Sequence, residues 1–190
     1  MICGAWGGRP DKDGIEAVTN ASQNLSNMPV EVIEAEHPVR IEDYGFVTDS
    51  CGAGQYRGGV GVRRSYRILA EDALLQMRTD RVRFAPYGLS GGEPGGQSRN
   101  FMEIGNERRA LPGKITTRVD KGTLIIHEQA GAGGFGNPLA RDPGEVYEDV
   151  LDGKISAAYA LRHHAVVLGA RGALDQAATA SLRAQRQQGA

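Results

Sequence analysis

The sequence predicts an α+β fold in which a β-rich, glycine-rich domain is followed by a short helical region. Glycine supplies 27 of the 190 residues, strand-like runs dominate up to about residue 130, and helix signals appear only afterwards. The glycines stand in compact groups between these runs, which is typical of ordered turns and close backbone contacts rather than of a flexible linker. We expect a loop-rich N-terminal segment at 1–27, a β-rich domain at 28–130, a glycine-rich crossing with helices at 131–168 and a tail at 169–190.

The β-rich domain begins with the segment "PVEVIEAEHPVRIEDYGFVTDS", which predicts two strands. Apolar and polar residues alternate in the first of them, and Pro29 and Pro38 limit its length. The next segment, "GVGVRRSYRILAEDALLQMRTDRVRF", carries β-type residues on both sides of "AED" and therefore predicts a hairpin. Further short strands are expected on either side of the turns at Gly105-Asn106 and Asp120-Lys121-Gly122.

The pattern changes to helical after residue 140. Asp142 is a good N-cap and Pro143 a good first helical residue, because proline lacks the N–H that would be unsatisfied there. Gly153 suits the left-handed position that ends such a helix, and Ser156 is expected to cap a second, shorter helix. The segment "AVVL" predicts a short last strand, and the tail has good helix formers with few large apolar residues.

The spacing G-x-G-x-x-G occurs at Gly131, Gly133 and Gly136, directly after an apolar run. A dinucleotide-binding loop needs a helix to begin at the third glycine, so that its N–H groups face the pyrophosphate. Here Pro138 keeps the residue before it out of the α region, and helix signals start only near Asp142. We therefore expect a glycine-lined crossing where backbone packs against backbone, and no cofactor-binding residues.

Two residues are candidate nucleophiles. Ser90 lies in "GLSGG", but a nucleophile elbow requires a strand before the serine and a helix after it, and "EPGG" follows instead. A turn serine is the better interpretation. Cys51 has no neighbouring base in the sequence, which favours a small buried cysteine over a reactive thiol.

No metal site can be assembled from neighbouring residues. His37 is close in sequence to several glutamates, but on the predicted strand only Glu31 shares its face, about 20 Å away along an extended chain. His163 and His164 are adjacent and are expected to have surface or packing roles.

Composition and charge exclude several classes of partner. The net charge of -1 lacks the excess of clustered lysine and arginine that binding to nucleic acid requires. The apolar runs are too short to span a bilayer, and the N-terminus does not resemble a signal peptide. With two cysteines and no disulfide framework, we expect a cytoplasmic protein.

Three ordered blocks resemble one family. The segment "NLSNMPVEVIEAEHPVRIEDYGFVTDSCGAGQYRGGVGVRRSYRIL" resembles the block of hydantoinase B/oxoprolinase proteins that ends in Asp-Ser-Gly-Gly-x-Gly-x-x-Arg-Gly-Gly-x-Gly. "DRVRFAPYGLSGGEPG" resembles an intermediate segment, and "AGAGGFGNPLARDPGEVYEDVLDGKIS" resembles the C-terminal signature. The resemblance spans about residues 4 to 168 and corresponds to the C-terminal third of the longer family members.

The resemblance implies a subunit or portion of a larger enzyme that is inactive alone. Family members open cyclic amides such as hydantoins and 5-oxoproline with ATP, and relatives carboxylate ketones such as acetone and acetophenone. The implied partners are an A-type, actin-like ATPase that binds ATP and the remainder of the B component, which is expected to hold a divalent metal. A hetero-oligomer is therefore expected, and a non-catalytic assembly module is the alternative.

The resemblance also marks candidate site residues in its first block. They are Glu31, Glu34, Asp49, Ser50 and Arg57, with Gly58 and Gly59 beside them. Arg57 is the best candidate for an anion contact, because a guanidinium binds phosphate or carboxylate in a bidentate manner. The alternative is that Arg57 pairs with Asp49 and fixes the turn.

Overall fold

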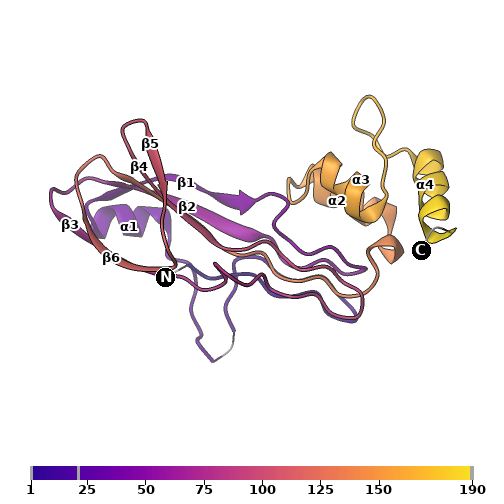
Figure 1. The fold of residues 1–190 in the computed structure, drawn as a ribbon, viewed down its shortest axis with the longest axis horizontal. Helices are drawn as coiled ribbons and strands as arrows, with labels where there is room; N and C mark the ends of the chain where they lie inside the picture. Colours follow the sequence, from indigo (N-terminus) through magenta and orange to yellow (C-terminus); the bar gives the residue numbers. More distant parts are fainter. Residues whose placement is uncertain (1, 21, 189–190) are drawn as a thin grey trace.

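The computed structural model describes residues 2–20 and 22–188 and has the α+β architecture expected from the sequence. Figure 1 shows an elongated molecule with two β-sheets at one end, helices α2, α3 and α4 at the other, and extended segments between them. In these described residues, no helix has both the length and the apolar character needed to cross a lipid bilayer.

The main sheet has five antiparallel strands in the order β1-β2-β7-β4-β5. The strands are β1 (Val39–Val47), β2 (Gly61–Ile68), β7 (Leu124–Glu128), β4 (Arg99–Ile104) and β5 (Glu107–Ala110). The strands expected around Gly105-Asn106 are confirmed, because Ile104 lies opposite Glu107 across a two-residue turn.

The second sheet pairs β3 (Ala73–Arg78) with β6 (Lys114–Val119). The predicted hairpin between β2 and β3 is therefore wrong, although both strands exist. Apolar residues of the two sheets form one core, with Ile68 and Ile125 from the main sheet and Met77 and Val119 from the second. Because β3 packs over the main sheet instead of extending it, the inner face of β2 and β7 is covered and removed from water.

Helix α1 (Val30–Glu36) replaces the strand predicted for this segment. Its valines and alternating pattern favour a strand, but only Ile33 is buried, so one apolar contact orients the helix. The carboxylate of Glu34 accepts the backbone N–H of Ile41 at 2.7 Å, which ties α1 to β1.

Glycine-rich segments lie between the sheets and the helices and bond to one another through their backbones. They comprise residues 50–59, 88–96 and 130–136, and few of their residues belong to regular elements. The N–H of Gly52 donates to the carbonyl of Ala132 at 2.7 Å. A Cβ on Gly131 would lie 1.8 Å from the carbonyl oxygen of Ser50, so no side chain fits there. The predicted crossing of backbone against backbone is therefore confirmed.

No helix begins at Gly136, which has a positive φ of 76°. A short 3-10 helix, η1 (Pro138–Ala140), follows, and helix α2 (Pro143–Leu151) begins only after it. As predicted, the described backbone around Gly136 therefore differs from a dinucleotide-binding loop, in which a helix begins at the third glycine.

The helical end contains α2, α3 (Ala157–His164) and α4 (Gln176–Gln188). Both predicted caps are confirmed: Asp142 accepts the N–H groups of residues 144 and 145, and Ser156 accepts that of Tyr159. The strand predicted at 165–168 is wrong, because only Leu168 forms an isolated bridge, to Leu174. A second apolar core joins α2 and α3 to the glycine-rich segments.

Candidate functional site

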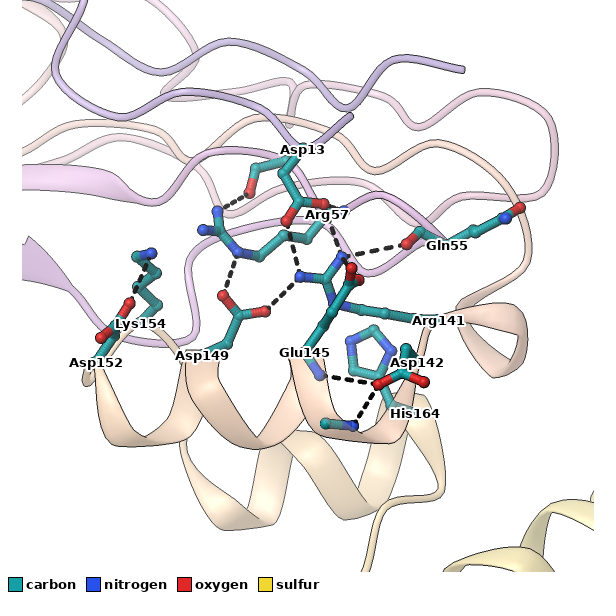
Figure 2. A network of polar contacts seen from close by, with 12 residues as sticks. Asp13, Gln55, Arg57, Arg141, Asp142, Glu145, Asp149, Asp152, Lys154 and His164 are labelled. Carbon is teal, nitrogen blue, oxygen red and sulfur yellow. Dashed lines mark hydrogen bonds and ion pairs between the residues drawn. The ribbon is translucent and has the colours of Figure 1, made fainter. Parts of the chain in front are cut away.

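A buried network of arginines and carboxylates lies where helix α2 meets the glycine-rich segments and the N-terminal segment (Figure 2). Its centre is Asp149, which lies on the same buried side of α2 as Val146. One carboxylate oxygen of Asp149 accepts the Nε–H of Arg57 at 2.7 Å, and the other accepts an Nη2–H of Arg141 at 2.8 Å. Asp149 therefore bridges two guanidinium groups that come from separate parts of the chain.

The N-terminal segment supplies two more carboxylates. Asp13 binds Arg141 in a bidentate manner, with both N···O distances at 2.7 Å, and it also accepts the backbone N–H of Arg57 at 2.8 Å. Glu16 accepts an Nη1–H of Arg57. Because planar bidentate pairs are the most directional ion pairs in proteins, Asp13 fixes both the position and the orientation of Arg141.

Burial and the neighbouring carboxylates shift the pKa values of the two arginines in opposite directions. Burial by itself would lower the pKa of Arg57, but the charges and hydrogen bonds of Asp149 and Glu16 outweigh it and raise that pKa. The pKa of Arg141 is raised in the same way, against burial, by Asp13 and Asp149 together with Glu145. Both guanidinium groups thus stay charged in the interior.

The network is suited to holding three chain segments together rather than to catalysis by its own groups. Arg57 and Arg141 are only 4 % and 2 % exposed, and carboxylates or carbonyls occupy most of their N–H groups. Removing one member would leave its partner charged and buried, which is strongly unfavourable. A phosphate bound at Arg57 would have to displace Asp149 or Glu16.

The alternative in which Arg57 pairs with Asp49 is wrong. Asp49 lies outside the network, and its carboxylate accepts the backbone N–H and the hydroxyl of Ser156 at 2.6 Å and 2.8 Å. Its backbone is in the left-handed region, with φ 63°. Asp49 therefore fixes the start of helix α3, while Asp149 takes the place predicted for it beside Arg57.

The other candidate residues are not brought together. The hydroxyl of Ser50 donates to the carbonyl of Val47 at 2.6 Å and accepts the N–H of Gly61 at 2.8 Å, so it stabilises the backbone between β1 and β2. Glu31 is exposed in the first turn of α1, and Glu34 binds the start of β1.

Gly58 and Gly59 are positions of close backbone approach. A Cβ on Gly58 would lie 1.9 Å from the carbonyl oxygen of Ala132, and one on Gly59 would lie 2.6 Å from that of Ile15. These glycines allow the loop of residues 50–59 that carries Arg57 (the Arg57 loop) to pass between the N-terminal segment and residues 130–136.

The predicted roles of the two candidate nucleophiles agree with their surroundings. Cys51 is buried, and burial raises the pKa of its thiol to about 11, which keeps it protonated. The hydroxyl of Tyr159 donates to the carbonyl of Cys51 at 2.7 Å. Ser90 lies in a turn with φ 53°, and no helix follows it.

The three histidines considered from the sequence do not form a metal centre. His164 is buried and its Nδ1 lies 3.0 Å from the carbonyl oxygen of Pro138, whereas His163 Nδ1 lies 2.6 Å from a carboxylate oxygen of Glu93. Among the residues that the structure describes, no three His, Cys, Asp or Glu side chains are grouped so that they could hold a metal ion.

Sequence reasoning missed most of the network, because its members are far apart along the chain. The missed residues are Asp13, Glu16, Arg141, Glu145 and Asp149. One signal was available: Asp149 is a carboxylate on the apolar side of an amphipathic helix, and such a residue requires a buried cation. Its partners could not be named, since they lie 8 and 92 positions away.

A family profile agrees with the architecture described above. The profile described as hydantoinase B/oxoprolinase matches residues 1–138, well over half of the chain. This chain belongs to the hydantoinase B/oxoprolinase family.

Individual relatives extend this match beyond residue 138. A putative B-type subunit of a D-/L-hydantoinase from Pseudomonas sp. (strain NS671) is 34% identical over 183 residues, which cover 95% of this chain and 31% of that protein. The crystal structure of ATP-dependent caprolactamase from Pseudomonas jessenii has a TM-score of 0.81 at 27% identity, over 96% of this chain and 33% of the other. A nucleotide-free acetone carboxylase structure shares the fold, with a TM-score of 0.78 at 23% identity, over 94% of this chain and 29% of the other.

All these proteins are much longer than this chain. The chain spans between about a tenth and a third of the curated relatives that it matches. Two of these relatives, the putative hydantoinase polypeptide and a caprolactamase polypeptide from Pseudomonas jessenii, are named as subunits.

Proposed function

We propose that this chain is the C-terminal portion, or a separate small subunit, of the B component of an ATP-dependent cyclic amide hydrolase of the hydantoinase/5-oxoprolinase type. The observation that carries the proposal is the match over 95% of this chain to a B-type hydantoinase polypeptide of which it spans 31%. In this proposal the chain is inactive alone and acts in a hetero-oligomer in the cytoplasm, with an actin-like ATPase and the remainder of the B component.

The chemistry assigned to the whole assembly explains why ATP is needed. An amide carbonyl is a poor electrophile, and phosphorylating its oxygen makes its carbon more electrophilic. Water adds to that carbon, the ring C–N bond breaks as the nitrogen takes up a proton and leaves as an amine, and hydrolysis of the resulting acyl phosphate releases the carboxylate and phosphate. We assign ATP to the ATPase partner and a divalent metal to the remainder of the B component, as the resemblance of the three sequence blocks implies.

Within the assembly, this chain would supply a wall of the site and part of the interface between subunits. The buried network supports this role, because it holds the N-terminal segment, the Arg57 loop and helix α2 in one arrangement. Of the candidate residues, Glu34, Asp49, Ser50 and Arg57 make contacts within this chain, so we assign them the role of supporting this wall from inside. Glu31 is exposed on α1 and has no ion-pair partner among the described residues, so it is free to meet another polypeptide.

The test is reconstitution with the neighbouring subunits. The complete mixture should hydrolyse hydantoin or 5-oxoproline with stoichiometric release of phosphate from ATP, and omitting this chain should abolish both products. Glu31→Gln, compared with Glu36→Gln on the same helix, then asks whether an exposed α1 carboxylate contributes to turnover. Unchanged rates when this chain is left out would remove the proposal.

A component of a ketone carboxylase is the second candidate, favoured by the shared fold with acetone carboxylase. Assaying the same mixture with acetone or acetophenone and labelled bicarbonate separates the two reactions. Incorporation of label without ring opening of a cyclic amide would assign the carboxylase. Full turnover of either class in mixtures that lack this chain would favour the third alternative, a non-catalytic assembly module.

A further inference from the structure

A groove of about 1000 Å³ runs between the N-terminal segment, the inner face of the main sheet and the loop that follows β3. Its floor includes Ile125 and His127 of β7, and its sides include Trp6, residues 75–81 and residues 86–89. The two nitrogens of His127 lie 2.7 Å from the amide oxygen of Asn100 and 3.1 Å from that of Gln129. Because both ring nitrogens of His127 are engaged by neighbouring side chains, His127 is not free to act as a base. The groove is therefore better suited to binding a partner than to catalysis.

The sides of this groove expose large apolar side chains. Tyr87 is 72 % exposed, Leu89 54 % and Trp6 37 %, and all three line the groove. Phe84, on the same loop, is 71 % exposed. Contiguous exposed apolar surface next to a groove is characteristic of an interaction site, and tryptophan and tyrosine are enriched where binding energy is concentrated.

The same side of the groove carries unpaired positive charge. The segment Arg78–Arg83 contains three arginines and one aspartate, Asp80, and so has a net charge of +2. Arg78 and Arg81 line the groove, and no ion pair involves either of them among the described residues. Elsewhere on the sheets most exposed arginines do have a carboxylate partner, as Arg118 has Asp72. An occupant with apolar side chains flanked by carboxylates fits this surface.

We propose that this groove is the docking surface for the remainder of the B component, which would insert an acidic, apolar segment between Trp6 and Tyr87. The inference rests on the proposed function. The length of the relatives favours this occupant, because about two thirds of the caprolactamase chain lies outside the region that superposes on this one. A region of that size must bury surface of its own against the matched region. The groove combines exposed aromatic side chains with arginines that have no carboxylate partner in the described part of the chain. The aromatic side chains would bind apolar residues of the occupant, and the arginines would bind its carboxylates.

The experiment measures binding between this chain and the separately expressed remainder of the B component from the same genome. Affinity copurification and titration calorimetry compare the unaltered chain with two variants, Tyr87→Ser/Leu89→Ser and Arg78→Glu/Arg81→Glu. Each should weaken binding by about tenfold or more, since each removes residues of the kinds that dominate interfaces. Thermal unfolding monitored by circular dichroism verifies that both variants are folded.

Matched controls lie at the other end of the molecule. Leu151→Ser, at the end of helix α2, removes a comparably exposed apolar side chain, and Arg171→Glu, between α3 and α4, reverses an exposed arginine; neither residue lines the groove. These should leave the dissociation constant within about twofold of the unaltered value. A photo-crosslinking side chain at position 87 identifies the occupant directly, and it should react with the remainder of the B component.

Three results separate this inference from the proposed function. If the unaltered chain does not bind the remainder, the proposed function falls and this inference falls with it. If the chain binds and the groove variants bind equally well, the proposed function stands but the groove is not its docking surface. A crosslink at position 87 to the ATPase or to a second copy of this chain would likewise overturn the assigned occupant.

Discussion

Arginine and carboxylate side chains are paired in two regions of this protein, and the surroundings of the pairs differ sharply. On the outer face of the main sheet, Arg40 lies 2.6 Å and Arg67 3.1 Å from one oxygen of Glu42, and all three side chains are substantially exposed. Around Asp149 the distances are similar, at 2.7 Å to Arg57 and 2.8 Å to Arg141, but these side chains are almost completely buried.

The comparison shows that the N···O distance alone does not tell which ion pairs contribute to the stability of the fold. Exposed pairs gain little, because water and salt screen the attraction and two long side chains lose freedom. Members of the buried network have already lost their hydration, so each depends on the others. The buried network also joins segments that are far apart in sequence, whereas the outer pairs lie within β1 or join it to β2, to which it is already held by backbone hydrogen bonds.

The largest effect is expected for Asp149→Ala, which leaves two buried guanidinium groups without their shared carboxylate. Breaking a buried pair by removing one partner typically costs about 3–5 kcal/mol. We expect the free energy of unfolding, measured by urea denaturation, to fall by this order. Asp152→Ala, at the C-cap of the same helix, is the matched control, because Asp152 is exposed and its one ion pair among the described residues is with Lys154. If the two variants are equally stable, the buried network does not hold the segments together.

Gly131→Ala tests how much the close backbone contact at residue 131 contributes to stability, compared with the buried network beside it. The new Cβ would lie 1.8 Å from the carbonyl oxygen of Ser50, so the two segments must separate. Overpacking of this kind costs about 1–3 kcal/mol, and contact with backbone places this position at the upper end.

Gly45→Ala is its counterpart in the main sheet. No atom lies within 4 Å of a Cβ at Gly45, so alanine is tolerated there. Thermal melts of both variants should therefore separate by several degrees. An unchanged melting temperature for Gly131→Ala would mean that the segments around it can move apart freely.

The helical region also makes the stability of the protein depend on pH. Burial lowers the pKa of His164 to about 4, and the nearby Arg141 and His163 act in the same direction, against the opposing effects of the hydrogen bond with the Pro138 carbonyl and of the Asp149 carboxylate. The unfolded chain, with an ordinary histidine pKa near 6.5, binds a proton first as pH falls. Stability from neutral His164 is thus complete above about pH 6.5 and is lost progressively toward pH 4.

Between pH 8 and pH 5 this one group should lower the free energy of unfolding by ~2 kcal/mol. Denaturation at intermediate pH values measures the slope. His164→Gln keeps a polar side chain that can meet the carbonyl of Pro138 but cannot titrate, and it should flatten the profile over this interval. A variant profile parallel to that of the unaltered protein would assign the pH dependence to other groups.

How far the sequence could predict these regions depends on the range of the interactions. The start of α2 was predictable from Asp142 and Pro143, because capping involves residues two or three positions apart. Helix α1 was not, since its seven residues have a strand-like pattern and one buried contact, Ile33, orients it. The pairing of β3 with β6 also lay beyond local pattern, because hydrophobicity marks a buried face without naming the partner strand.

The same limit applies to the site. Arg57 was singled out from the sequence as a candidate for an anion contact, with pairing to the nearby Asp49 as the alternative, but its partner lies on α2 at Asp149. The clustered glycines of residues 50–59, 88–96 and 130–136 were more informative, because most of them leave no room for a side chain and so predict a close backbone approach even when the approaching segment is unknown.

The smallest effect is expected for Glu42→Ala on the outer face of the sheet. Removing this carboxylate leaves Arg40 and Arg67 exposed to water, which hydrates them as well as Glu42 did. The midpoint of urea denaturation should stay within the scatter of replicate measurements at moderate salt, and raising the salt concentration should not alter the difference. A loss comparable to that of Asp149→Ala would mean that the outer pairs act as a cooperative network despite their exposure. In that event burial would not explain why the two regions differ in their contribution to stability. The difference would then depend only on the fact that the Asp149 network joins segments far apart in the sequence.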